Sequence, residues 1–228
     1  MNFRYLPPNF FQRLVWMPLR LSIILFCSLK IKGIEHIKKT QGNFIVASNH
    51  ISEMDPLLLV SVLPFFYNHL PLLYVGRQKS LYTGSKWKRV LYGGIFFKII
   101  GAYPSYKGQD NYHKALPHHL EAVSKGVNIA IFPYGGIFRD HDIRKARGGV
   151  SFLAHETNLP VIPLKIKGTE NFTLKNITSG KMKISFIFGK PLYAKDIFKN
   201  PNKVIVNSKR NDYFDAARLV MDSVENLN

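Results

Sequence analysis

Cysteine, acidic residues and long apolar runs are all scarce in this sequence. Cys27 is the only cysteine among 228 residues, which excludes an internal disulfide bond and a zinc site built from cysteines. A single cysteine is typical of a reducing compartment such as the cytoplasm. Asp and Glu total 14 against 32 Lys and Arg, so the formal net charge is +18. This charge favours anionic partners, which include nucleic acid, acidic lipid surfaces and phosphate-bearing substrates.

The longest apolar stretch covers residues 14–29 (LVWMPLRLSIILFCSL) and is interrupted by Pro18 and Arg20. It is short for a membrane span, which needs about 20 predominantly apolar residues, and no cleavage site typical of a signal peptide follows it. Two interpretations stay open, namely a helix packed on the core and a helix lying in a membrane interface. We predict a membrane-associating segment over residues 1–30 and one domain over 31–228. The residues suited to an interface are Phe10, Phe11, Arg13, Trp16 and Arg20.

The rest of the chain alternates short apolar strands with helical segments and contains no internal repeat. Its clearest buried strand is the run VNIAIF at 127–132. Strands separated by helices predict an α/β domain with a mostly parallel central sheet flanked by helices. Further strands are expected at 30–34, 43–48, 72–75, 102–104, 161–167 and 183–188, and helices at 56–63, 86–100, 111–125, 149–157 and 212–224.

A polar cluster follows the strand at 43–48, at the carboxyl end where open α/β sheets bind their ligands. Asn49 and His50 come first, and Asp55 stands directly before Pro56, a pattern typical of a helix start. A tight loop can bring the side chains of His50 and Asp55 together. Asp55 can then accept the imidazole N–H and orient His50 as a general base for an alcohol. The alternative is a structural pair in which Asp55 only caps the helix.

The chain has no G-x-S-x-G nucleophile elbow. Direct attack by a substrate hydroxyl is therefore favoured over an acyl-enzyme intermediate.

A second cluster follows the strand at 127–132 and has the sequence Phe132-Pro133-Tyr134-Gly135-Gly136. Its backbone N–H groups can bind an anion, and its glycines allow a ligand to approach closely. The alternative is a plain turn followed by solvated cations. Those cations are Arg139, Arg144, Lys145 and Arg147. Elsewhere, Lys107 follows a short extended segment and can either pair with phosphate or face water.

Together these motifs resemble those of the glycerolipid acyltransferase family, whose best-known members acylate lysophosphatidic acid. The motifs occur in the family's order over roughly residues 30–195. The family's Asn-His-x4-Asp motif is matched by Asn49, His50 and Asp55. The positions that match its other motifs are Gly101 with Lys107, the segment FPYGG at 132–136 where the family usually has Phe-Pro-Glu-Gly-Thr, and the strand end VIP at 161–163.

The resemblance implies that His50 deprotonates an acceptor hydroxyl, which attacks the thioester of acyl-coenzyme A or acyl carrier protein. It implies that Asp55 orients His50 and that no metal or other cofactor takes part. The acceptor's phosphate and glycerol are expected to contact the second and third motifs. The substrate-binding positions so implied are Asn49, Lys107, Phe132, Pro133, Tyr134, Gly135, Gly136 and Arg139.

Two departures from the family pattern concern the acceptor pocket. Lys107 replaces the usual arginine, which keeps the charge and loses the bidentate fork for phosphate. Tyr134 replaces the usual glutamate and removes a carboxylate. Because no arginine occupies position 137, Arg139 or another nearby cation has to serve. The acceptor is therefore lysophosphatidic acid, another lysophospholipid or another lipid alcohol.

We expect an O-acyltransferase of phospholipid biosynthesis at an anionic membrane surface, on its cytoplasmic face, with no nucleic-acid partner. One alternative is a catalytically inactive lipid-binding protein on the same fold, which Tyr134 favours and the His50–Asp55 pair opposes. The other is a nucleic-acid-binding protein, suggested by the charge and by eleven tyrosines. No recognised nucleic-acid-binding motif accompanies that charge.

Overall fold

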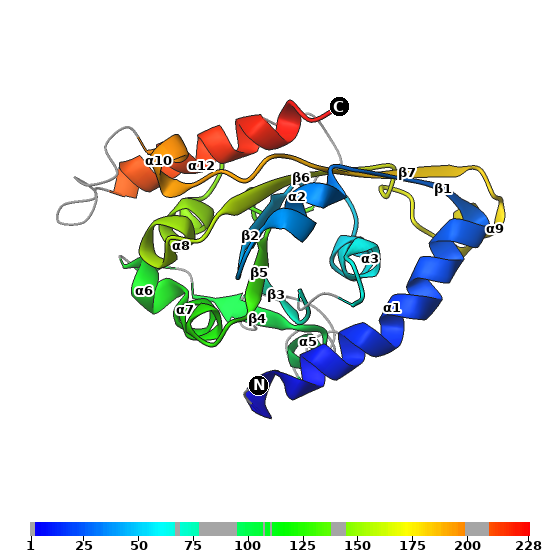
Figure 1. The fold of residues 1–228 in the computed structure, drawn as a ribbon, viewed down its shortest axis with the longest axis horizontal. Coiled ribbons are helices and arrows are strands. Elements are labelled where there is room, and N and C mark those ends of the chain that lie inside the picture. The colour runs from blue at the N-terminus through cyan, green and yellow to red at the C-terminus, as the bar shows by residue number, and fades with distance from the viewer. Residues whose placement is uncertain are drawn as a thin grey trace.

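A single sheet organises the chain, which the computed structural model describes over residues 3–66, 69–77, 95–106, 108–109, 111–137, 145–198 and 210–228. Within these ranges seven strands pair in the order β1-β7-β6-β2-β5-β3-β4 (Figure 1). Neighbouring strands are parallel except for β6 and β7, which are antiparallel. The predicted mostly parallel α/β sheet is thus confirmed. The strands are β1 (Cys27–Lys32), β2 (Ile45–Ser48), β3 (Leu72–Arg77), β4 (Ala102–Ser105), β5 (Asn128–Ile131), β6 (Val161–Lys167) and β7 (Met182–Phe188).

Helices cover both faces of the sheet (Figure 1). One hydrophobic cluster joins the sheet to α7, α8, α10 and α12, and the other joins it to α1, α2, α3, α5 and α9. The helices are α1 (Leu6–Phe26), α2 (Ile34–Lys39), α3 (Asp55–Val62), α5 (Ile95–Ile100), α6 (Tyr112–Ala115), α7 (Pro117–Ser124), α8 (Gly149–Thr157), α9 (Leu174–Thr178), α10 (Ala194–Ile197) and α12 (Arg210–Glu225), preceded by the 3-10 turn η1 (Phe3–Tyr5).

The central strands β2 and β5 are buried along their whole length. Their sequences, IVAS and NIAI, are nearly continuous apolar runs without polar alternation. This is the pattern expected of parallel strands that are covered by helices on both faces. The carboxyl ends of β2 and β5 lie side by side because the two strands pair in parallel, with Ala47 opposite Ile131. Both polar clusters noted in the sequence begin at this edge of the sheet.

The N-terminal helix α1 is joined to the domain through a buried glutamine. Gln12 Nε2 donates to the carbonyl oxygens of Leu72 (2.7 Å) and Ile100 (3.1 Å), and its Oε1 accepts from the Leu72 N–H (2.8 Å). Trp16 Nε1 donates to the carbonyl oxygen of Leu63 at 2.9 Å. One side of α1 therefore packs on the domain, as the core-packing interpretation predicts.

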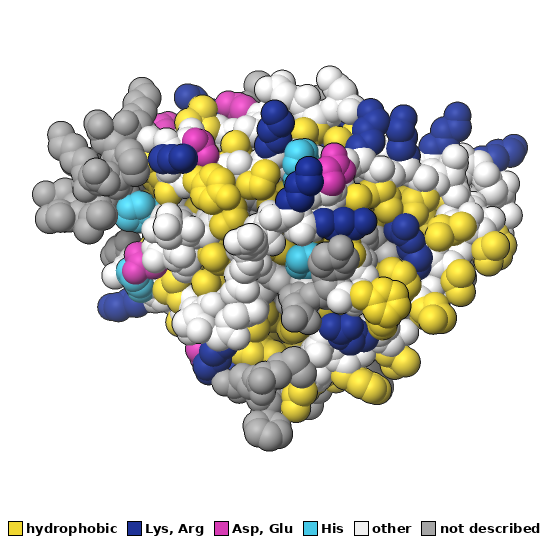
Figure 2. Space-filling view, viewed as in Figure 1, with side chains coloured by type: hydrophobic (Ala, Val, Ile, Leu, Met, Phe, Trp, Pro, Cys, Tyr) yellow, Lys and Arg dark blue, Asp and Glu magenta, His cyan; other side chains and the backbone are white. Residues whose placement is uncertain are grey.

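The opposite side of α1 carries a stripe of exposed apolar side chains, which we call the α1 stripe. It consists of Phe10 (69% exposed), Leu14 (61%), Met17 (61%), Leu21 (49%) and Ile24 (53%). Spacings of three and four residues place all five on one face of the helix. Figure 2 shows hydrophobic side chains gathered along the side of the molecule where α1 lies. In the described part of the chain, no helix is long and apolar enough to cross a membrane.

The first strand differs from its prediction because Gly33 ends it. Gly33 has φ +70°, and a Cβ atom there would lie 2.0 Å from the carbonyl oxygen of Phe188. The chain therefore turns at Gly33 and begins α2 at Ile34. At its other end β1 begins at Cys27, directly after α1. The predicted division at residue 30 thus falls inside a strand.

The helix predicted over residues 111–125 is two helices, so that prediction was wrong in this detail. Pro117 has no N–H to continue the first helix, and α7 begins there. The short helices α2, α9 and α10 were not predicted. Of the helix expected at 86–100, the structure describes the end, α5, and residues 86–94 lie outside the described residues.

Candidate active site

His50, in the loop between β2 and α3, meets Asp55, the first residue of α3. His50 Nδ1 lies 2.9 Å from Asp55 Oδ2. Because Oδ2 is an acceptor when ionised, Nδ1 carries the proton and Nε2 holds the lone pair of the neutral ring. Among the described residues, none hydrogen-bonds to Nε2. The His50 side chain is 16% exposed, so solvent and substrate can reach part of this ring.

The Asp55 carboxylate is fully buried and accepts four hydrogen bonds. Besides His50, Oδ2 accepts from the backbone N–H groups of Ile51 and Ser52, both at 2.8 Å. Oδ1 accepts from the Thr169 hydroxyl at 2.6 Å. A buried carboxylate needs such partners because an uncompensated charge is costly to bury. The four donors hold the Asp55 carboxylate in place beside His50.

The helix-cap alternative for Asp55 is not what the structure shows. Asp55 is the first residue of α3, and no side-chain cap bond is formed at that helix start. Its carboxylate instead turns back toward Ile51 and Ser52, upstream in the loop. These bonds wrap the loop around the carboxylate and bring His50 beside it.

Asn49 has a structural contact on β6. Its Nδ2 donates to the carbonyl oxygen of Ile166, and its Oδ1 accepts from the Ile166 N–H, both at 2.8 Å. The side-chain amide thus continues the β2–β6 ladder one step beyond the end of β2. This geometry indicates that Asn49 positions the loop, whereas the sequence predicted a substrate contact.

Phe132 lies flat against the catalytic candidate. Its ring centroid is 4.2 Å from that of His50 and the ring planes are inclined by 19°. Phe132 is also nearly parallel to Tyr74, with centroids 6.5 Å apart and planes inclined by 6°. The Tyr74 hydroxyl donates to the carbonyl oxygen of Pro56 at 2.5 Å, and burial raises the pKa of Tyr74 well above its usual value. Phe132 therefore supports the imidazole ring, a role that the sequence did not indicate.

The loop after β5 forms a tight turn beside a cation. The Gly135 N–H donates to the carbonyl oxygen of Phe132 at 2.9 Å, so it closes the turn. Gly135 has φ +77°, and a Cβ atom there would lie 2.8 Å from the guanidinium carbon of Arg147. Pro133 accepts from the Arg147 backbone N–H at 2.9 Å. The turn thus places the exposed side chain of Arg147 against Gly135. Anion binding by Gly136 stays a prediction.

Tyr134 packs away from this stack, in the hydrophobic cluster that includes α8 and α12. Burial raises its pKa, and the carboxylates of Glu225 and Asp222 add to the effect. Phe132 packs in the opposite cluster, with α3. The tyrosine that stands where the family usually has glutamate is therefore oriented toward the C-terminal helix.

Two predicted substrate contacts, Lys107 and Arg139, lie outside the described residues. Their roles remain predictions. Within the described ranges, no group of three or more His, Cys, Asp and Glu side chains is placed to hold a metal ion.

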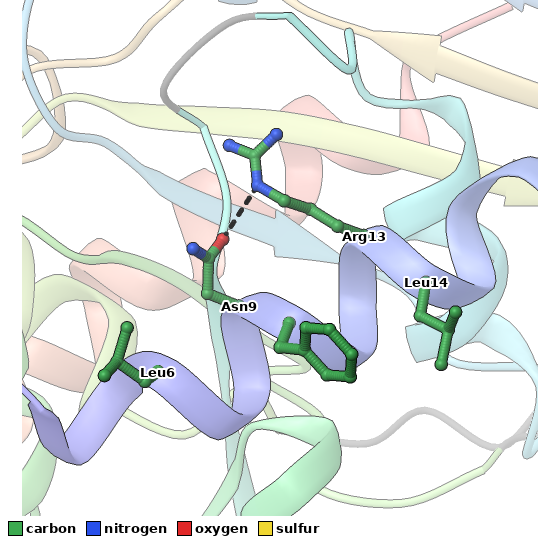
Figure 3. Close-up of a pocket in the computed structure, with 5 residues that line it drawn as sticks. Leu6, Asn9, Arg13 and Leu14 are labelled. Carbon is green, nitrogen blue, oxygen red and sulfur yellow. Dashed lines mark hydrogen bonds between the residues drawn. The ribbon is translucent and has the colours of Figure 1, made fainter.

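A cavity of about 570 Å³ opens on α1, where the described lining residues are Leu6, Asn9, Phe10, Arg13 and Leu14. Figure 3 shows Arg13 and Asn9 on one side of the helix, joined by a hydrogen bond of 3.1 Å from Nε to Oδ1. Arg13 Nη1 also donates to the carbonyl oxygen of Phe65 at 3.2 Å. The cavity adjoins the α1 stripe, with which it shares Phe10 and Leu14.

The sequence missed two residues of the site, Thr169 and Tyr74. Each is far from His50 in the chain and reaches the site only through the order of the strands. Thr169 follows the end of β6, and Tyr74 lies within β3. A small hydroxyl residue after a strand is too common to single out.

A family model described as Acyltransferase matches residues 28–167. This chain belongs to the acyltransferase family. The matched range contains the His50–Asp55 pair, the loop at Phe132, strands β2 to β6 and all of β1 except Cys27. It begins within β1, so α1 precedes the matched range.

Known members of the acyltransferase family resemble this chain at low identity. A 1-acyl-sn-glycerol-3-phosphate acyltransferase from Borreliella burgdorferi is 27% identical over 151 residues, which cover 64% of this chain and 54% of that protein. A chloroplastic enzyme of the same name from Brassica napus is 25% identical over 65% of this chain and 40% of its own length. The chain thus spans about half the length, or less, of these curated relatives.

A solved structure shares the fold. The 1-acyl-sn-glycerophosphate acyltransferase PlsC from Thermotoga maritima superposes with a TM-score of 0.60 and 19% sequence identity, over 94% of this chain and 80% of that one.

Proposed function

We propose that this chain is an O-acyltransferase of phospholipid biosynthesis. It transfers a fatty acyl group from acyl-coenzyme A or acyl carrier protein to a hydroxyl of a lysophospholipid or a glycerol-phosphate lipid. The observation that carries the proposal is the 2.9 Å contact between His50 Nδ1 and Asp55 Oδ2, with Nε2 left unbonded by the described residues. Family membership and the names of the relatives support it.

The proposed reaction proceeds by direct transfer. His50 Nε2 takes the proton of the acceptor hydroxyl as its oxygen attacks the thioester carbonyl carbon. The tetrahedral intermediate then collapses, the C–S bond breaks, and the imidazolium returns the proton to the leaving thiolate. Asp55 keeps the ring in the Nδ1–H tautomer and stabilises the positive charge that forms on it. No metal or cofactor takes part in the proposed steps.

The acceptor is proposed to carry a phosphate. The relatives from Borreliella and Brassica are named for 1-acyl-sn-glycerol-3-phosphate, which makes lysophosphatidic acid or a related lysolipid the acceptor to test first. Arg147 is exposed beside Gly135 and provides a positive charge next to the turn after β5. Lys107 and Arg139 are the further cations proposed to bind the phosphate.

The membrane contact is proposed to be the α1 stripe. The stripe places five exposed apolar side chains on one face of a helix. Contiguous apolar patches of this kind mark interaction sites, whereas single exposed apolar residues are ordinary. A helix of this kind lies in the interface with its apolar face buried at the headgroup boundary. The formal charge of +18 would attract an anionic surface to the protein. We propose this surface to be the cytoplasmic face of a membrane, with no nucleic acid as partner.

The test is lipid mass spectrometry after incubation of the purified full chain with acyl-coenzyme A or acyl carrier protein and a mixed pool of lysolipids. The proposal predicts a new diacyl product that His50→Ala abolishes. His113→Ala is the matched control, because His113 is a 52% exposed histidine on α6. Binding of lysolipid without any product from either donor would instead identify an inactive lipid-binding protein on the same fold. Salt-dependent binding of DNA or RNA without binding to anionic vesicles would contradict both.

A further inference from the structure

We propose that Thr169 is a positioning residue for His50, acting through Asp55 from the carboxyl end of β6. This proposal rests on the proposed function and names a third member of its catalytic assembly. Thr169 has no exposed surface, and its Oγ1 donates to Asp55 Oδ1 at 2.6 Å. It comes from a segment 114 residues away from Asp55 in the chain.

The hydroxyl of Thr169 completes the restraint on the Asp55 carboxylate. The bond to His50 and the two backbone N–H bonds all fall on Oδ2. Oδ1 has the Thr169 hydroxyl as its hydrogen-bond donor among the described residues. With donors on both oxygens, the carboxylate plane is held against rotation about χ2, a torsion that is otherwise broad. The direction of Oδ2, and with it the orientation of the imidazole, depends on this bond.

A second contact fastens the other end of the same loop to β6. Asn49, the residue before His50, exchanges two hydrogen bonds of 2.8 Å with the backbone of Ile166. The catalytic loop is thus held on both sides of His50, by Ile166 on β6 and by Thr169 just beyond the end of β6. This double attachment explains how a loop, which is otherwise the most mobile part of a fold, can present a base in one orientation.

Gly168 allows the chain beyond β6 to bring Thr169 to Asp55. It has φ +82°, and a Cβ atom there would lie 1.9 Å from the carbonyl oxygen of Lys183 on β7. The chain therefore turns sharply after β6 and directs Thr169 toward Asp55. A residue with a side chain at 168 would have to move β7 or lose this turn.

The test compares Thr169→Val, which keeps the shape and removes the hydroxyl, with Thr169→Ser, which keeps the hydroxyl. Because Thr169 contacts Asp55 and lies behind it, we expect Thr169→Val to lower kcat and leave KM for the acceptor within about twofold. The expected fall is roughly 10- to 100-fold, the range known for outer hydrogen-bond partners of metal-binding histidines. Thr169→Ser should recover most of kcat. Thr157→Val is the matched control, because among the described residues the Thr157 hydroxyl bonds only its own helix, at the carbonyl oxygen of Leu153.

A second measurement keeps the proposal separate from the assignment of function. The Nδ1 proton of His50, observed by NMR in the full chain, should broaden or move upfield in Thr169→Val and return in Thr169→Ser. If the wild type turns over no lysolipid while this signal responds as described, the proposed function fails and the positioning role stands. Unchanged kcat and an unchanged signal in folded Thr169→Val would overturn the positioning role.

Discussion

The ring of Phe132 covers one face of the His50 imidazole, with centroids 4.2 Å apart and planes inclined by 19°. Asp55 binds the same imidazole at its edge, through Nδ1. The imidazole is therefore restrained in two directions, by residues that follow two adjacent parallel strands. If Phe132 and Asp55 position His50 and do not bind substrate, their substitution should lower kcat more than it raises KM.

Substituting Phe132 should affect turnover more than acceptor binding. Aromatic pairs contribute about 0.5–1.5 kcal/mol beyond buried area, so Phe132→Leu should lower kcat by roughly 2- to 13-fold. KM for the lysolipid should change little. Steady-state kinetics check this, with Phe172→Leu as control because Phe172 is a partly buried phenylalanine of the same hydrophobic cluster. A large rise in KM with kcat intact would support the original expectation of a substrate contact.

Replacing the carboxylate of Asp55 should nearly abolish activity. The native carboxylate accepts hydrogen bonds from His50, Ile51, Ser52 and Thr169. In Asp55→Asn one oxygen becomes an NH2 group, which is itself a donor and cannot accept from them. By analogy with the aspartate of Ser-His-Asp triads, kcat should fall by about 10⁴-fold. Initial rates and thermal unfolding measured together distinguish lost chemistry from lost fold. Retention of a tenth or more of kcat would show that Asp55 does not orient the base.

The attachment of α1 should be sensitive to Gln12. In Gln12→Leu the buried N–H of Leu72 and the carbonyl oxygens of Leu72 and Ile100 lose their side-chain partner. Leaving one buried polar group unpaired costs about 1–3 kcal/mol, and the free energy of unfolding in urea should fall by at least that amount. Gln41→Leu is the control, because Gln41 is exposed in a loop. Equal stability of the two variants would contradict the anchoring role.

A charge in the α1 stripe should weaken membrane binding without harming the fold. Leu14 is 61% exposed, so Leu14→Glu should leave the melting temperature close to that of the wild type. Sedimentation with anionic vesicles should show a reduced bound fraction, because the glutamate would have to enter the interface. Leu219→Glu on α12, at a leucine 43% exposed, should bind vesicles like the wild type. Indistinguishable binding of all three proteins would place the membrane contact elsewhere.

Stability should decrease as the solution becomes acidic because of His119. Burial lowers its pKa from 6.5 to about 4, so the folded protein keeps the ring neutral while the unfolded chain protonates it. The stabilising contribution is complete above pH 6.5 and is lost as the pH falls toward 4, with a total of about 3 kcal/mol. Burial also lowers the pKa of His69 and His118, which act in the same direction. Urea unfolding at pH 7 and pH 5 should show a smaller difference in His119→Gln than in the wild type.

The sheet and the contact between His50 and Asp55 could be predicted because both depend on local pattern. Continuous apolar runs marked the central strands, and the short spacing of His50 and Asp55 allowed a loop to join them. The remaining contacts depend on the order of the strands in the sheet, and local sequence pattern does not predict that order. Thr169 meets Asp55 because β6 is the neighbour of β2, and Tyr74 meets Phe132 because β3 pairs with β5.

The role of Phe132 shows a second limit of local pattern. The motif at 132–136 indicated ligand contact as a block, but its residues separate in space. Phe132 packs toward α3 and His50, while Tyr134 packs toward α12. Residues two apart share a face in a strand, but β5 ends at Ile131 and the chain turns at Pro133 and Tyr134, so Phe132 and Tyr134 pack on opposite sides.

The most direct test of the central claim is the rate of thiol release from acyl-coenzyme A or acyl carrier protein, measured with and without lysophosphatidic acid. We expect release that depends on the lysolipid, saturates with it, and falls to background in His50→Ala. An intact rate in folded His50→Ala would contradict the assignment of His50 as the general base.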